Sequence, residues 1–135
     1  FLPDKVVYHA FSPEHLAIQQ DAIEVGHSTV VIGYPLGFQD TLHQLLVARQ
    51  AAIASSFGLR FQGQGYFLTD ARTHRGTSGA PVVARVGRLS SANLPWLLLG
   101  IHSSRLDVGT RDIVLDEALG LNCVWYADAL MSLTE

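Results

Sequence analysis

Cysteine is nearly absent from this sequence: Cys123 is the only one among 135 residues. A single cysteine cannot form a disulfide within the chain, and it cannot build a metal site from several thiolates. The six histidines show no His-x-His or His-Glu-x-x-His spacing, so nothing favours a zinc site. We therefore expect no metal and no cofactor. Periplasmic, secreted and cytoplasmic locations all remain open, because exported proteins can also lack disulfides.

Long runs of one kind of residue are missing as well. The net charge is −3, and Lys and Arg form no run of the kind that binds nucleic acid. The longest apolar runs, such as Trp96 to Leu99, are too short to cross a bilayer. We therefore expect neither nucleic acid nor membrane as a partner. The sequence has an ordinary globular balance, 48% hydrophobic and 16% charged, which suits one domain with a core.

Short β-branched runs separated by glycine and proline predict an all-β fold. Residues 28–33 form the clearest strand, which ends before Pro35 because proline cannot donate to a ladder. The Ala-rich residues 45–55 fit helix or strand by periodicity, and the glycines that follow favour a strand. The remaining predicted strands are residues 5–9, 65–69, 80–86 and 96–103. Their simplest assembly is a single six-stranded antiparallel Greek-key barrel.

The two ends of the chain differ from this pattern. Val124 to Leu133 contains no glycine or proline, and its apolar stripe with a spacing of four predicts a C-terminal helix. Residues 1–20 are mixed and contain Pro3 and Pro13, which is typical of an interdomain connector. We thus divide the chain into a connector, 1–20, and a nucleophile-bearing barrel with its helix, 21–135.

The segment Gly76-Thr77-Ser78-Gly79 has the composition of a tight turn between two apolar strands. Successive amides in such a turn can converge on a negative oxygen, and a serine beside them has what acyl transfer needs. We expect Ser78 to be the catalytic nucleophile and the N–H groups of Gly76 and Ser78 to form the oxyanion hole. A plain Gly/Ser turn explains the same residues. The Gly-x-Ser-x-Gly elbow of α/β-hydrolases is excluded because Ala80 interrupts it.

Gly76-Thr77-Ser78-Gly79-Ala80-Pro81 resembles the nucleophile signature of trypsin-like (chymotrypsin-superfamily) serine proteases of bacterial type. Further segments resemble family motifs in the same order, and together they run from about Gly26 to the end. These segments are Val25 to Gly37 (V-G-x-x-V-x-x-I-G-x-P-x-G), Thr69-Asp70-Ala71 (T-D-A) and Leu99 to Ser103 (G-I-x-S).

The resemblance implies a two-barrel endopeptidase in which this chain is the C-terminal half. The catalytic His and Asp come from the first barrel, so we expect them outside this chain and expect the chain alone to be inactive. Asp4 follows Leu2-Pro3 instead of an apolar strand, and no histidine has the family's T-A-x-H context. The implied partners are a peptide or protein substrate and the N-terminal barrel of the same protein.

The resemblance also implies which residues bind substrate: Thr73, His102, Ser103, Ser104 and Arg105. A Thr/His pair at the first two positions resembles glutamyl endopeptidases and viral proteases that cut after Gln. A hydroxyl and an imidazole N–H can both donate to a side-chain oxygen, so we expect Glu or Gln before the scissile bond.

Two residues depart from the family pattern. Thr77 stands where trypsin has the Asp that answers zymogen cleavage, which argues against that activation route. Arg105 stands where many members have glycine, and it either narrows the cleft, recognises an acidic group or is a solvated loop residue.

Two other functions stay open: a non-catalytic, peptide-binding pseudoprotease barrel, and half of a capsid or self-processing viral protease.

Overall fold

The computed structural model describes residues 9–17, 22–86, 94–107, 114 and 119–134, and all structural statements below concern these residues. Its strands are β1 (Ser28–Gly33), β2 (Val47–Ala52), β3 (Tyr66–Thr69), β4 (Pro81–Arg85), β5 (Trp96–Arg105) and β6 (Asn122–Tyr126). One α-helix, α2 (Asp128–Thr134), follows β6. Short 3₁₀ turns occur at Pro13–His15 (η1), Pro35–Gly37 (η2) and Phe61–Gly63 (η3). The strand predicted over residues 5–9 lies outside the described residues apart from His9, which has no regular structure.

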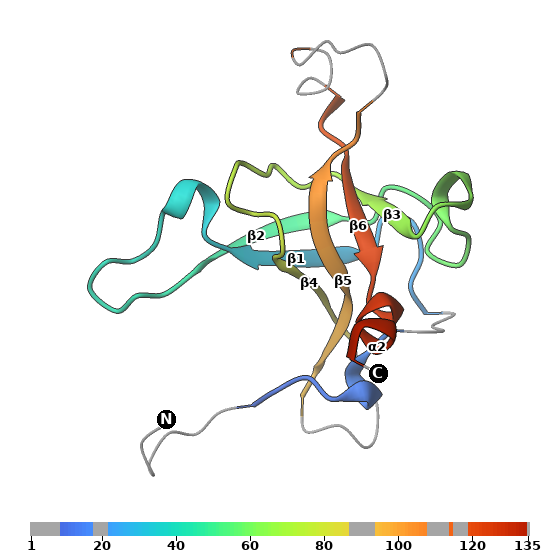
Figure 1. Ribbon diagram of the computed structural model, residues 1–135, viewed down its shortest axis with the longest axis horizontal. Helices are drawn as coiled ribbons and strands as arrows, with labels where there is room; N and C mark the ends of the chain where they lie inside the picture. The colour runs from blue at the N-terminus through green and yellow to red at the C-terminus, as the bar shows by residue number, and fades with distance from the viewer. Residues whose placement is uncertain (1–8, 18–21, 87–93, 108–113, 115–118, 135) are drawn as a thin grey trace.

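The strands form one antiparallel sheet in the order β2-β1-β4-β5-β6-β3. Its two edge strands meet, because Ile53 and Thr69 form an antiparallel bridge and the N–H of Ala54 donates to the carbonyl of Leu68 at 2.8 Å. In Figure 1, β1 and β2 run across β5 and β6, so the sheet is strongly curled. The connection from β3 to β4 crosses from one edge of the sheet to its middle. The predicted six-stranded antiparallel barrel with a C-terminal helix is confirmed.

The helix begins later than its sequence pattern predicts. Residues 122–126 are the strand β6, and α2 starts at Asp128 instead of Val124. Val124 pairs with Phe67 on β3 and with His102 on β5, so this segment is hydrogen-bonded on both sides. Pairing with two neighbours outweighs the local preference of a short apolar run for helix. Residues 122–126 thus supply the sixth strand.

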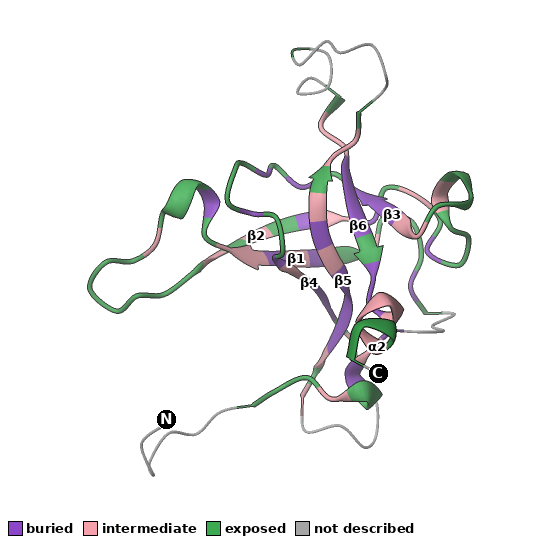
Figure 2. Cartoon of the chain, viewed as in Figure 1, coloured by how far each residue is buried: buried purple, intermediate pink, exposed green. Residues whose placement is uncertain are grey.

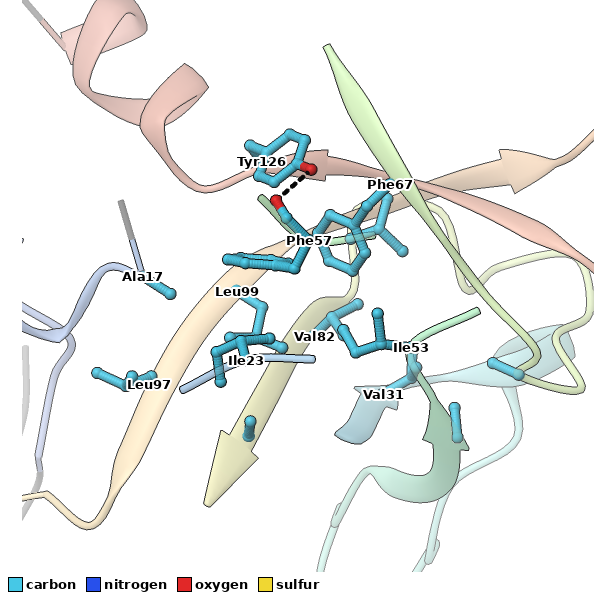
Figure 3. Packing of buried hydrophobic residues seen from close by; sticks show 14 of the residues in the cluster. Ala17, Ile23, Val31, Ile53, Phe57, Phe67, Val82, Leu97, Leu99 and Tyr126 are labelled. Atoms are coloured by element: carbon cyan, nitrogen blue, oxygen red, sulfur yellow. Dashed lines mark hydrogen bonds between the residues drawn. The ribbon is translucent and has the colours of Figure 1, made fainter. Parts of the chain in front are cut away.

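The main cluster of buried apolar residues draws on all six strands, and Figure 2 shows buried positions along the sheet. Three of its rings pack against one another in edge-on or tilted arrangements: those of Phe57, Phe67 and Tyr126, with centroids 5.0 to 5.2 Å apart. The Tyr126 hydroxyl donates to the carbonyl of Phe57 at 2.7 Å, which satisfies the polar end of a buried ring (Figure 3). This packing ties the connection between β2 and β3 to β6.

A second, smaller cluster lies on the outer face of β4 and β5, where Val83 and Leu98 pack against Ala127. Leu16 and Leu130 pack against the same cluster, so α2 and the first described residues cover one patch of the sheet. The N–H of Ala17 donates to the carbonyl of Leu98 at 3.0 Å. These contacts support the outer face of β5. The C-terminal end of the same strand contacts the turn that carries Ser78.

Candidate active site

Ser78 stands on two consecutive β-turns that share Thr77. The N–H of Thr77 donates to the carbonyl of His74 at 3.1 Å, and the N–H of Ala80 donates to that of Thr77 at 3.0 Å. Gly76 and Gly79 occupy the third position of these turns, with φ of 88° and 87°. A type II turn needs such a φ there, which explains both glycines. The turns leave Ser78 exposed just before β4.

Gly76 is also required for space. A Cβ at this position would lie 2.8 Å from the carbonyl oxygen of Tyr34 and 3.2 Å from the nitrogen of Leu36. The N–H of Leu36 donates to the carbonyl of Arg75 at 2.6 Å. Because a trans peptide is planar, the N–H of Gly76 points opposite to that carbonyl, away from Leu36.

The N–H of Ser78 has a similar setting, since the preceding carbonyl of Thr77 is turned toward Ala80. Within the described part of the chain, the N–H groups of Gly76 and Ser78 have no hydrogen-bond acceptor. Each is therefore a donor that a ligand at the turn can use.

The Ser78 side chain contacts the end of β5. Its hydroxyl donates to the carbonyl oxygen of Ser103 at 2.6 Å. Two backbone bonds of 2.8 Å fix this neighbourhood: the N–H of Gly79 donates to His102, and the N–H of His102 donates to Ala80. Among the described residues, no histidine is a hydrogen-bond partner of Ser78.

Ser78 and the predicted substrate-binding residues line one hollow of about 350 Å³, which we call the Ser78 hollow. All five of those residues line it: Thr73, His102, Ser103, Ser104 and Arg105. Gly76 is not among the lining residues. Leu36, His74 and Arg75 line the hollow too and were not predicted. His74 and Arg75 belong to the segment that leads to Ser78, whereas Leu36 is distant in sequence and reaches this segment through the bond of its N–H to the Arg75 carbonyl.

Thr73 is held at its hydroxyl and at its carbonyl. Its hydroxyl donates to Oδ1 of Asn122 at 2.7 Å, and its carbonyl accepts from a guanidinium nitrogen of Arg105 at 3.0 Å. Asn122 is 1% exposed and donates in turn to the carbonyl of Ala71 at 2.6 Å. The hydroxyl hydrogen of Thr73 is thus used inside the protein, and its oxygen can only accept from a ligand. Sequence reasoning missed Asn122, whose one signal is an amide within an apolar segment.

His102 is 3% exposed on β5. Burial lowers the pKa of its imidazole below the ordinary value, because charging the ring would cost solvation. Its Nδ1 is buried and has no hydrogen-bond partner among the described residues. At neutral pH His102 is therefore an uncharged ring with one N–H to donate.

No three His, Cys, Asp or Glu side chains in the described ranges gather in a way that would hold a metal ion. Nor does this part of the chain contain a helix that is long and apolar enough to span a membrane.

Comparison with known proteins gives one family match. The family model of the trypsin-like peptidase domain matches residues 5–90, a range that contains β1 to β4 and the turn of Ser78. No curated protein matches the sequence. Since the family match spans well over half of the 135 residues, this chain belongs to the trypsin-like peptidase domain family.

Proposed function

We propose that this chain is the C-terminal, nucleophile-bearing half of a serine endopeptidase. The observation that carries the proposal is the Ser78 hollow: an exposed serine on a double glycine turn lines the same hollow as Thr73, His102 and Arg105. If the scissile peptide bond of a substrate lies at Ser78, the side chain of the residue before that bond lies beside these residues. The family match supports the peptidase class.

In the proposed reaction, the Ser78 hydroxyl leaves its bond to the Ser103 carbonyl and attacks the peptide carbonyl carbon. A histidine of a first barrel, outside the described residues, takes the hydroxyl proton, and the carbonyl oxygen becomes an oxyanion. The N–H groups of Gly76 and Ser78 bind that oxygen, a role supported by their lack of any internal acceptor. The histidine then gives the proton to the leaving amine as the tetrahedral intermediate collapses.

The proposed side chain before the scissile bond is Glu or Gln. His102 offers one neutral N–H, and the Thr73 oxygen offers an acceptor, because its own hydrogen is donated to Asn122. A donor next to an acceptor suits the amide of Gln, which has both groups. A neutral imidazole gives Glu no charge advantage, and an ionised carboxylate has no hydrogen to donate to the Thr73 oxygen, so we expect Gln to be used in preference to Glu at neutral pH.

A non-catalytic peptide-binding barrel is the second candidate. The observation that favours it is the hydroxyl of Ser78, which is bound to the Ser103 carbonyl instead of to a base. Such a barrel would keep the hollow and bind peptides without cleaving them.

The test is hydrolysis of a peptide library by the full-length protein, its Ser78→Ala variant and Ser56→Ala, an exposed serine outside the hollow. Cleavage after Glu and Gln that is lost only in Ser78→Ala supports the endopeptidase. Peptide binding without cleavage in the unaltered protein favours the binding barrel. A preference for basic or large aromatic side chains contradicts the assignment of the pocket.

A further inference from the structure

A second hollow, of about 690 Å³, adjoins the Ser78 hollow. We call it the Asn122 hollow. Its lining includes Arg49, Arg72 and Asn122, which do not line the Ser78 hollow. Both hollows share Thr73, His74 and Arg105. These shared residues therefore form the wall between the two hollows.

The Arg105 side chain is the longest part of this wall. It starts at the last residue of β5 and reaches the carbonyl of Thr73, to which a guanidinium nitrogen donates at 3.0 Å. Arg105 pairs with Asn122 in the ladder of β5 and β6, and Asn122 holds the Thr73 hydroxyl. Residues of two strands, Arg105 on β5 and Asn122 on β6, thus both bond to Thr73 in this wall. Because the guanidinium of Arg105 is bonded to Thr73, the apolar stem of its side chain lies along the wall between the two hollows.

We infer that Arg105 is a specificity-determining residue, because it closes the Ser78 hollow toward the Asn122 hollow. This inference rests on the proposed function, in which the Ser78 hollow receives the substrate side chain. With the wall in place, that side chain must end at the Arg105–Thr73 contact, which suits the length of Glu or Gln and excludes large aromatic rings. Removing the Arg105 side chain joins the two hollows and admits a ring such as that of Phe.

The test measures binding, so it does not depend on catalysis. Short acetylated peptides that end in Gln or in Phe, both with uncharged side chains, are titrated into the full-length protein, Arg105→Ala, Arg105→Ser and Arg72→Ala, with a thermal melt of each variant. Arg72 lines the Asn122 hollow but not the Ser78 hollow, so its variant is the matched control. We expect affinity for the Phe peptide, relative to the Gln peptide, to rise about tenfold or more in whichever of Arg105→Ala and Arg105→Ser folds. Arg72→Ala should keep the ratio of the unaltered protein.

An unchanged Phe-to-Gln ratio in the folded Arg105 variants overturns the inference. The same rise in Arg72→Ala also overturns it, because the wall would then not be Arg105. Hydrolysis assays on the same proteins separate this result from the proposed function. If the protein cleaves peptides through Ser78 but the affinity ratio does not change, only the proposed role of Arg105 is wrong. If the affinity ratio changes but neither the unaltered protein nor any variant cleaves peptides, the role of Arg105 is supported and the endopeptidase proposal is contradicted.

Discussion

The Ser78 hydroxyl donates to the carbonyl oxygen of Ser103 at 2.6 Å, so the proposed nucleophile is bound by the strand that borders its own hollow. A carbonyl oxygen accepts this hydrogen bond but cannot take up the proton, so the Ser78 hydroxyl stays protonated. Attack on a substrate requires a base that competes for the same hydrogen.

We therefore predict that the 135-residue chain alone hydrolyses no peptide above background. Loss of catalytic-triad members costs on the order of a million-fold in turnover. The measurement is release of a fluorescent group from peptide substrates by the purified chain. Robust cleavage that disappears in Ser78→Ala contradicts the prediction and assigns the base to a histidine of this chain.

The two turn glycines give a matched pair of variants. Gly76→Ala and Gly79→Ala both place a side chain at positive φ, a conformation that costs roughly 1–2 kcal/mol. At Gly76 the new Cβ also meets the Tyr34 carbonyl at 2.8 Å, whereas nothing lies within 4 Å at Gly79. Urea denaturation should show a larger loss of unfolding free energy for Gly76→Ala. Equal losses would mean that the Tyr34 turn moves aside freely.

Asn122 should contribute strongly to stability. Asn122→Ala leaves the buried Thr73 hydroxyl and the Ala71 carbonyl without their partner, which costs about 1–3 kcal/mol for each unsatisfied group. The control is Gln50→Ala, which removes an exposed hydrogen bond to Ser28 and should change little. Chemical denaturation of both variants checks the difference. If Asn122→Ala is as stable as Gln50→Ala, the Thr73 contact is not a stabilising one.

Local signals in the sequence were sufficient for most strands. The strand over residues 28–33 was predicted with its true limits, because Pro35 cannot continue a ladder and the β-branched run before it fits a pleated sheet. The gathering of Ser78 with the five predicted substrate-binding residues followed from motif order. Each of these features depends on residues close together in sequence or on a pattern shared by the family.

The features that sequence reasoning missed depend on distant partners. Residues 122–126 are a strand because β3 and β5 both pair with them, which no local propensity reveals. Leu36 reaches the Ser78 hollow through one hydrogen bond to Arg75, far along the chain. The Thr73 hydroxyl was expected to donate to substrate, and only the position of Asn122 shows where its hydrogen goes.

The connection between β1 and β2 should make the chain self-associate. Leu36, Phe38, Leu42 and Leu45 are all exposed there, and an apolar patch of this kind rarely stays bare. Sedimentation velocity at rising concentration should show dimers or larger species, reduced in Leu42→Ser. Leu133→Ser is the control, because Leu133 on α2 is equally exposed, at 81%, but stands away from the patch. A clean monomer at high concentration contradicts the prediction.

His102 should make the fold sensitive to acid. Burial holds its pKa below the ordinary value of 6.5, so as the pH falls the unfolded chain takes up this proton before the folded one does. The unfolded state then binds more protons, and stability falls with pH. The loss begins as the pH drops through about 6.5 and ends only below the lowered pKa of the folded state. The variant His102→Leu places an apolar side chain at this buried position of β5 and has no proton to bind.

The measurement is the free energy of unfolding in urea at pH 7.5 and pH 5.5 for the unaltered chain and for His102→Leu. Other titrating groups contribute equally to both proteins, so the difference between the two pH dependences isolates His102. We expect the unaltered chain to lose more stability over this interval. Equal losses would show that the folded protein protonates His102 as readily as the unfolded chain does, and that the ring is not held neutral beside Ser78.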